Sequence, residues 1–170
     1  PFDASQAKAY QDAWAKHLGT QVETTNSVGQ KMILIPPGEF LMGSTPEQIA
    51  AALKAASEIG TDQTTNDRIS KSEAPQHRVA ITKPFRIGTT EVTVGEFAKF
   101  VTATGYKTEA EQEALAQNKQ QPTPLRPGVP VSLDPPAAWI NWTAATAYCR
   151  WLSDQEKTTY RLPTEAEWAY

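Results

Sequence analysis

The chain has 170 residues with 16 basic and 19 acidic side chains, so its net charge is −3, and it is long enough for one domain with a hydrophobic core. The small acidic excess argues against a broad phosphate-binding surface, so we expect no nucleic-acid partner. No apolar run approaches the roughly 18 residues that a membrane span needs.

Six segments begin with residues that favour the start of a helix. In four of them a threonine is followed three residues later by Glu or Gln, and each of these side chains can cap a free backbone N–H of the first turn. Asp3 with Gln6 is a looser version of this pattern before a helix at residues 4–18, and Thr143 opens another helix without an acidic partner. The four threonine boxes are Thr45–Gln48, Thr93–Glu96, Thr108–Glu111 and Thr164–Glu167.

Short strand candidates lie between these helices. Residues 31–36 form an apolar run that ends in a Pro-Pro-Gly turn signal, and residues 39–43 follow at the distance of a hairpin. Residues 77–82 alternate in polarity, and two further short strands lead into the helix after Thr93, at residues 85–88 and 90–93. Strands and helices do not alternate regularly, which argues against a doubly wound parallel sheet.

Two connections are long and polar or rich in proline. We predict surface loops at residues 61–76 and 117–138, because connections of this length are uncommon in a compact domain unless they have a function or are disordered. Residues 1–28 are polar and rich in alanine, which favours a linker or accessory helix before a main domain at residues 29–170. The alanine-rich helix at this end also predicts further domains upstream.

The side chains that could bind a metal are scattered along the sequence. His17 and His77 are far apart in sequence, and metal sites usually need three or four clustered ligands. Asp62, Asp67 and Asp134 are scattered and match no calcium-binding loop. We therefore expect no metal ligand and no cofactor-binding residue among these positions.

The charged residues near residue 165 resemble an acid–base pair but are better explained by structure. Glu165 and Glu167 stand two positions apart on a helix and point in different directions, so they cannot share a proton. Glu167 fits the helix cap, Glu165 favours the positive helix N-terminus, and Pro163 with Trp168 fits a hydrophobic staple. We expect structural contacts for Arg161, as an ion pair or to carbonyl groups.

Five phrases in a fixed order resemble the formylglycine-generating enzyme family, also called the sulfatase-modifying factor family. They are MILIPPGEFLMGS (32–44), EAPQHRVAI (73–81), FRIGTTEVTVGEFAKFV (85–101), NWTAATAYCRWLS (141–153) and YRLPTEAEWAY (160–170). The resemblance covers about residues 30–170. We expect structural roles for the positions that carry it, namely Gly43, Glu73, Pro75, Glu91, Cys149, Arg161, Pro163, Glu165, Glu167 and Trp168.

The resemblance implies a C-type-lectin-related α+β fold that is rich in loops and incomplete at its C-terminus. In the family the last phrase lies near the middle of the domain, and about another hundred residues normally follow. This chain is therefore expected to be the N-terminal portion of a domain. The face that carries Trp151 and Trp168 should then be exposed.

The family's chemistry lies in the part that this chain does not match. The enzymes oxidise a cysteine of a sulfatase to formylglycine with oxygen and a copper ion held by two late cysteines, and the calcium ligands also come late. This chain has one cysteine, Cys149, on the flank of a helix beside Tyr148, and we expect it to be packed or disulfide-bonded rather than catalytic. We expect no catalytic residue in this part, which should be inactive alone; copper and calcium would belong to the complete domain.

Two main functions remain open for the complete protein. We favour a homologue of uncharacterised or binding role that recognises a protein, peptide or carbohydrate through its loops, since fold does not imply function. Trp139 ends the proline-rich loop and is the aromatic residue that we expect in such a role. The alternative is a copper-dependent oxidase that converts a sulfatase cysteine to formylglycine. A weaker third option is an iron-dependent sulfoxide synthase of the same fold, which would need a histidine-rich partner domain.

The tripeptide Asn141-Trp142-Thr143 also matches the acceptor pattern for N-glycosylation, which is common by chance.

Overall fold

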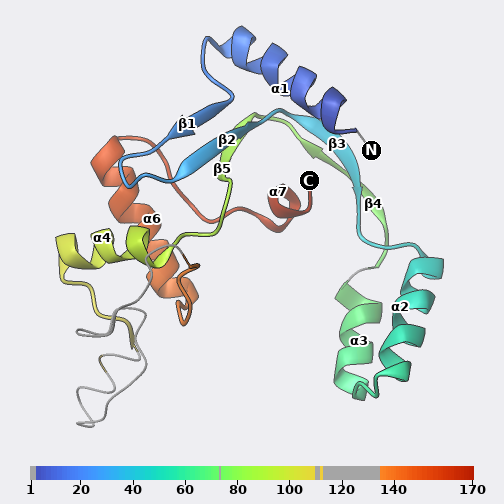
Figure 1. Ribbon diagram of the computed structural model, residues 1–170. Coiled ribbons are helices and arrows are strands. Elements are labelled where there is room, and N and C mark those ends of the chain that lie inside the picture. The colour runs from blue at the N-terminus through green and yellow to red at the C-terminus, as the bar shows by residue number, and fades with distance from the viewer. Residues whose placement is uncertain (1–2, 73, 110–111, 113–134) are drawn as a thin grey trace. The chain divides into compact units, whose positions relative to one another are not determined.

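A computed structural model describes residues 3–72, 74–109, 112 and 135–170, and Figure 1 shows its helices and strands. The chain forms two compact units, each made of segments that are distant in sequence. Unit 1 comprises Pro1–Ile35 and Phe85–Leu162, and unit 2 comprises Pro36–Pro84 and Pro163–Tyr170. Helices and strands occur in both units, so the fold is α+β.

The sheet of unit 1 is antiparallel and has three strands in the order β1-β2-β5. In its register, Ile33 lies opposite Glu23 on one side and opposite Ile87 on the other. The helix that precedes the sheet is tied to it by Gln11, whose side-chain amide donates to the carbonyl oxygen of Leu34 at 3.1 Å. These elements are α1 (Ala4–Leu18), β1 (Glu23–Thr25), β2 (Lys31–Ile35) and β5 (Phe85–Gly88).

The core of unit 1 lies around two helices, α4 (Val94–Thr104) and α6 (Trp142–Glu156). Their aromatic rings pack closely, with the ring centroids of Phe97 and Tyr148 5.9 Å apart and those of Phe100 and Trp151 5.6 Å apart. Such aromatic pairs add about 0.5–1.5 kcal/mol beyond the burial of their area. The buried cluster consists of Val28, Phe97, Phe100, Ala144, Tyr148 and Leu152.

Unit 2 contains a two-stranded antiparallel ribbon, β3 (Gly38–Met42) with β4 (His77–Ile81). Between these strands the chain forms two helices that lie side by side at one end of the ribbon, α2 (Pro46–Glu58) and α3 (Gln63–Ser72) (Figure 1). The short C-terminal helix α7 (Glu165–Ala169) contacts β4. Among the described residues of unit 2, only Pro36 and Ala56 are buried, so this unit has almost no core of its own.

The helix starts predicted from local sequence are mostly confirmed. Complete capping boxes are present at Asp3, Thr45, Thr93 and Thr164. They can be recognised in the sequence because both capping partners lie within three residues of each other. The partner expected for Thr108, Glu111, lies outside the described residues, as does most of the predicted loop at 117–138.

Four local predictions are wrong. The predicted loop at 61–76 contains helix α3, in which Asp67 accepts hydrogen bonds from Gln63 and Lys71 one turn away on either side. Residues 31–36 and 39–43 do not form a hairpin, because β2 pairs with β1 and β5 while β3 pairs with β4.

The other two errors concern the regions before α4 and α6. Residues 90–93 form no strand and contribute a single bridge, between Thr93 and Pro136. The cap of α6 is Asn141, not Thr143, since the Asn141 side chain accepts from the N–H of Ala144 at 2.9 Å.

No helix among the described residues is both long enough and apolar enough to cross a membrane.

Candidate functional site

Two of the family-signature positions in unit 2 shape the end of the ribbon. Gly43 follows β3 with a φ of 86°, a left-handed conformation that favours glycine. Its carbonyl oxygen accepts a hydrogen bond at 3.2 Å from the side chain of Gln76, the residue after Pro75. This contact links the two ends of the segment that contains α2 and α3. The third position of this part, Glu73, lies outside the described residues.

The start of α7 is built by its own side chains. Glu167 accepts from the N–H of Thr164 at 2.8 Å, and the Thr164 hydroxyl accepts from the N–H of Glu167 at 3.2 Å. Glu165 lies in the first turn, where a negative charge is favoured by the helix dipole. Pro163 is exposed and Trp168 is 72% exposed, so the predicted staple between them does not bury the indole.

Glu91 and Arg161 lie in unit 1 and are both exposed. Arg161 donates to the neighbouring carbonyl of Leu162 at 3.1 Å, which is one of the carbonyl contacts predicted for it. Glu91 makes no hydrogen bond or ion pair with any other described residue.

Cys149 lies on α6 and is half-buried beside the aromatic core of unit 1. Burial raises the pKa of its thiol above the ordinary value, because the thiolate would lose its hydration. A reactive or metal-binding cysteine needs the opposite environment, one that stabilises the thiolate. Its position therefore suits packing.

Trp151, predicted to be exposed with Trp168, is instead partly buried against the same core. The exposure predicted for Trp168 is confirmed.

A polar network joins the β1–β2 turn to the end of α6. Glu156 accepts from the N–H and the hydroxyl of Ser27 at 2.7 and 2.6 Å, and from the hydroxyl of Tyr160 at 2.6 Å. Burial and then the bond to Glu156 raise the pKa of Tyr160 to about 12. Burial acts to raise the pKa of Glu156, but the bonds from Ser27 and Tyr160 outweigh it and the net direction is downward. No local pattern could have revealed this network, because Ser27 and Glu156 are 129 positions apart.

Two exposed tryptophans flank the start of α6, and we call Trp139 and Trp142 the tryptophan edge. Their side chains are 77% and 73% exposed. Trp139 has a φ of 62°, which is a strained conformation for a bulky residue and is maintained only when the surroundings enforce it. The surroundings here include two backbone hydrogen bonds to the start of α4, from Val94 N–H to Pro135 O and from Ala137 N–H to Val92 O.

Asn141 lies between the two tryptophans and has a structural role. Its side-chain oxygen caps α6, and its Nδ2 donates to Glu109 at 2.9 Å. The amide that a glycan would modify is therefore already hydrogen-bonded. Trp139 was singled out by the sequence; Trp142 was not, since the first position of a helix carries no signal for exposure.

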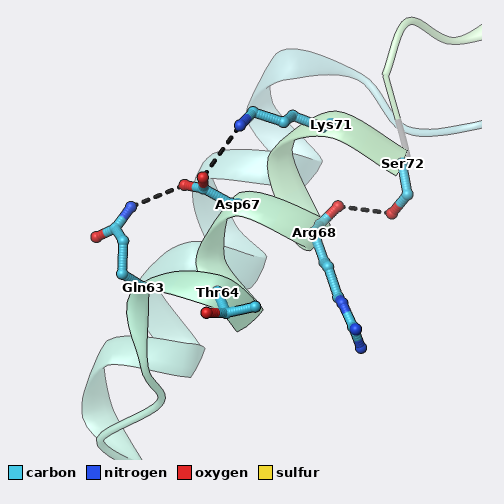
Figure 2. Close-up of a pocket in the computed structure, with 6 residues that line it drawn as sticks. All are labelled: Gln63, Thr64, Asp67, Arg68, Lys71 and Ser72. Carbon is cyan, nitrogen blue, oxygen red and sulfur yellow. Dashed lines mark hydrogen bonds and ion pairs between the residues drawn. The ribbon is translucent and has the colours of Figure 1, made fainter.

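An open hollow of about 450 Å³ lies along α3 and is lined by that helix alone. Figure 2 shows that Arg68 points away from the Asp67–Lys71 pair, so the charges of this face do not converge on one point. The hydrogen bonds from Gln63 and then Lys71 hold the pKa of Asp67 below its ordinary value. The lining residues are Gln63, Thr64, Asp67, Arg68, Lys71 and Ser72, and nothing in their arrangement forms a catalytic group.

Within the described ranges, no group of three or more His, Cys, Asp or Glu side chains is placed to hold a metal ion. His17 packs edge-on against Trp14, and the Nδ1–H of His77 donates to the carbonyl of Pro75. A two-thiolate copper site does not fit this chain, because its single thiol is half-buried in the core.

Three comparisons with known proteins agree with one another. The profile of the sulfatase-modifying factor enzyme 1-like domain matches residues 18–170. A formylglycine-generating enzyme of Bos taurus is 32% identical over 170 residues, covering 82% of this chain and 38% of that protein. An inactive C-alpha-formylglycine-generating enzyme 2, also of Bos taurus, is 27% identical over 182 residues and covers 89% of this chain and 52% of that protein.

The solved structure of PvdO from Pseudomonas aeruginosa is similar in fold and has 25% sequence identity. The match has a TM-score of 0.55 and covers 85% of this chain and 48% of that one. The chain thus spans about half or less of the length of the relatives it matches.

Proposed function

This chain belongs to the sulfatase-modifying factor enzyme 1-like family, and we propose that it is the non-catalytic N-terminal portion of a domain whose complete protein has a binding role. The single observation that carries the proposal is the state of Cys149. It is the one cysteine of the sequence, it is half-buried beside the aromatic core, and burial raises the pKa of its thiol. Oxidation by the family mechanism needs two thiolates for copper, so these 170 residues cannot perform it.

The tryptophan edge supports the binding role. Exposed indoles provide large, rigid contact area, and tryptophan is enriched among the residues that dominate binding energy. Trp139 also has a strained backbone with a φ of 62°, and it follows a segment in which Pro135 and Ala137 are hydrogen-bonded to Val94 and Val92. We infer that the partner is a protein or peptide and that Trp139 and Trp142 contact it. The strain at Trp139 would then serve to present the indole to that partner.

The second candidate is the copper-dependent oxidase that makes formylglycine in a sulfatase. It is favoured by the identity of 32% to a protein named as a formylglycine-generating enzyme, against 27% to one named as inactive. In this case the copper-holding cysteines, and any calcium ligands, would lie in the part of the domain that this chain does not contain. We also propose that the complete domain has a C-type-lectin-related fold and begins at residue 29, and that the protein is bacterial.

The experiment uses the complete protein, loaded with copper, and a peptide that contains a sulfatase modification motif. Conversion of the peptide cysteine to an aldehyde is followed by mass spectrometry. We expect no turnover; turnover would reject the non-catalytic proposal and establish the oxidase. A variant with Trp139→Ala and Trp142→Ala should lose capture of the binding partner but leave any turnover of a short peptide unchanged.

A further inference from the structure

Helix α1 belongs to unit 1, although it lies almost wholly outside the family profile. The profile matches from residue 18 onward, which is the last residue of the helix. The helix packs against β2 (Figure 1), yet only Ala15 is buried and only Gln11 and Trp14 are half-buried, while its other side chains are exposed. Local opening is easiest where few apolar contacts are broken. The packing of α1 alone therefore holds it weakly.

An arginine on the far strand of the sheet reaches the connection between α1 and β1, residues 19–22, which we call the α1–β1 linker. Arg86 lies on β5, and β2 separates that strand from β1. Its guanidinium nevertheless extends across β2 and donates to the Thr20 hydroxyl oxygen at 3.0 Å. It also donates to the carbonyl oxygens of Gln21 and Val22, the latter at 3.2 Å. Three consecutive residues of the linker are thus held by one side chain.

The bonds of Arg86 make use of what distinguishes arginine from lysine. Each of its two Nη nitrogens donates to two oxygen atoms, and the fourth acceptor is the carbonyl of Met32 at 3.5 Å. Within the described ranges Arg86 forms no ion pair, so its charge is directed at these neutral oxygens. A guanidinium holds five N–H groups in a rigid planar fork, whereas a lysine ammonium has three donors on one nitrogen. A lysine at this position could not bind the same set of oxygens.

The linker that Arg86 holds is continuous with the last turn of α1. Gly19 ends the helix in a left-handed conformation with a φ of 64°, and the N–H of Thr20 donates to the carbonyl oxygen of Ala15 at 2.9 Å. The bond from Arg86 to Thr20 therefore acts on the end of the helix itself. A second tie, from Gln11 to the carbonyl oxygen of Leu34 at 3.1 Å, lies about two turns earlier. Two attachment points along the helix fix its direction on the sheet.

We propose that Arg86 is a latch for α1: its bonds to the α1–β1 linker hold the helix against β2, and the helix releases as a unit, with Gly19 as the hinge, when these bonds open. The rest of unit 1 stays folded in the released state, because its core lies around α4 and α6. The two states differ in what they expose, since release uncovers Ala15, Trp14 and the part of β2 on which α1 packs. This conformational device does not depend on whether the complete protein binds a partner or oxidises a sulfatase peptide.

The test uses the complete protein and follows amide hydrogen exchange by mass spectrometry in the parent, Arg86→Met and Arg86→Lys. We expect α1 peptides to exchange roughly tenfold faster or more in both variants, the effect of losing one hydrogen bond to a charged group, while α6 peptides keep their rates. The matched control is Arg78→Met, since Arg78 is a strand arginine that pairs with Glu39 on the surface of unit 2, and it should leave α1 unchanged. Full protection of α1 in either Arg86 variant would overturn the proposal. Exchange of α1 in the parent at the rate of an unfolded chain would overturn it as well.

A second variant decides the case in which the Arg86 variants unfold the whole of unit 1. Thr20→Val removes one acceptor from the linker and leaves β5 unchanged. We expect faster exchange in α1 alone, together with faster cleavage by trypsin after Lys16, which lies in the last turn of the helix. Thr25→Val, at an exposed threonine of β1, is the matched control and should change neither rate. If Thr20→Val leaves α1 unchanged, or speeds the exchange of α1 and α6 equally, Arg86 is an ordinary structural residue of the sheet and the latch is rejected.

Discussion

The carboxylate of Glu156 on α6 accepts hydrogen bonds from both the N–H and the hydroxyl of Ser27, at 2.7 and 2.6 Å. Ser27 lies in the turn between β1 and β2, so this pair of bonds joins the sheet of unit 1 to its helices. The neighbouring residue Val28 belongs to the buried cluster, and its carbonyl oxygen accepts from Lys99 of α4 at 2.6 Å. One short turn is thereby held by both core helices.

We expect Glu156→Gln to destabilise the protein by about 1 kcal/mol at pH 7, because a charged acceptor of three hydrogen bonds, two from Ser27 and one from Tyr160, is replaced by a neutral one. The net effect of the surroundings is to lower the pKa of Glu156 from its ordinary 4.5. A lowered carboxyl pKa gives stability that is present above the unfolded-state pKa and is lost as pH falls through the folded-state pKa. The difference between variant and parent in the free energy of unfolding, measured in urea, should therefore be present at pH 7 and become smaller as the pH falls below 4.5.

Two further results check this assignment. Ser27→Ala should remove part of the same stability, and the double variant should lose less than the sum of the two single ones. The pKa of Tyr160, about 12 in the parent, should fall in Glu156→Gln when followed by its ultraviolet absorbance. Additive losses with an unchanged tyrosine titration would show that the pair is not coupled.

Tyr148→Phe should stabilise the protein. Tyr148 is 4% exposed in the centre of the core, but its buried hydroxyl has no hydrogen-bond partner among the described residues. An unsatisfied buried hydroxyl costs about 1–3 kcal/mol, and replacing it with an apolar group of the same shape removes that penalty. We expect the free energy of unfolding, measured in urea, to rise by about 1 kcal/mol.

Tyr148→Ala is the control, and its free energy of unfolding should fall by about 3–5 kcal/mol, as for other large-to-small changes in cores. A loss of stability in Tyr148→Phe would reveal a partner for the hydroxyl.

The part of the fold that could be read from sequence is the part fixed by neighbouring residues. The boxes at Thr45, Thr93 and Thr164 were found because both capping groups lie within one turn. The strand pairing could not be found in the same way. The paired residues of β2 and β5 are 50 to 56 positions apart in sequence, and no local pattern selects β5 over β3 as the partner of β2. Helix α3 was missed because its sequence is polar, and its support comes from side-chain bonds of Asp67.

The candidate site was predictable to a smaller extent. The order of phrases gave the family. Because one cysteine cannot make a pair, it also led us to expect a structural role for Cys149, which its half-buried position beside the core fits. It did not give the Ser27–Glu156 network or the exposure of Trp142, because both depend on tertiary packing. The expectation for Trp168 was correct and that for Trp151 was not, since Trp151 packs against Phe100 and Tyr148.

Asn141→Ala should destabilise the protein by about 1 kcal/mol, the usual loss when a helix N-cap is removed. The Asn141 side chain accepts from Ala144 N–H at 2.9 Å, whereas Thr143 lies inside the helix and is exposed. Thr143→Ala is therefore the matched control and should change stability by less than about 0.5 kcal/mol, as for an ordinary surface position. Thermal unfolding of the two variants measures the difference. Equal losses of stability in the two variants, or a larger loss for Thr143→Ala, would indicate that Thr143 caps α6.

The amide hydrogens of α2 and α3 should exchange much faster than those of α6. In the α2–α3 pair only Ala56 is buried, while α6 buries Ala144, Tyr148 and Leu152. Local opening is easiest where few apolar contacts are broken. Hydrogen exchange followed by mass spectrometry should show full deuteration of peptides from residues 46–72 before those from residues 144–152. Equal protection would mean that α2 and α3 have a partner beyond the described residues.

Cys149 should react slowly with alkylating reagents in the folded protein. The thiolate is the reactive species, and burial raises the pKa of this thiol, so at pH 8 a smaller fraction is ionised than in an unfolded chain. The side chain also packs against the core cluster of unit 1, which limits access. We expect alkylation by iodoacetamide at pH 8 to be slower in the folded than in the unfolded protein, because both the raised pKa and the limited access act in that direction. The rate of alkylation should rise together with the fraction of protein unfolded in urea.

If the thiol of the folded protein reacts as fast as that of the unfolded protein, Cys149 lies in an exposed site that stabilises the thiolate. Cys149 would then again be a candidate metal ligand or catalytic residue.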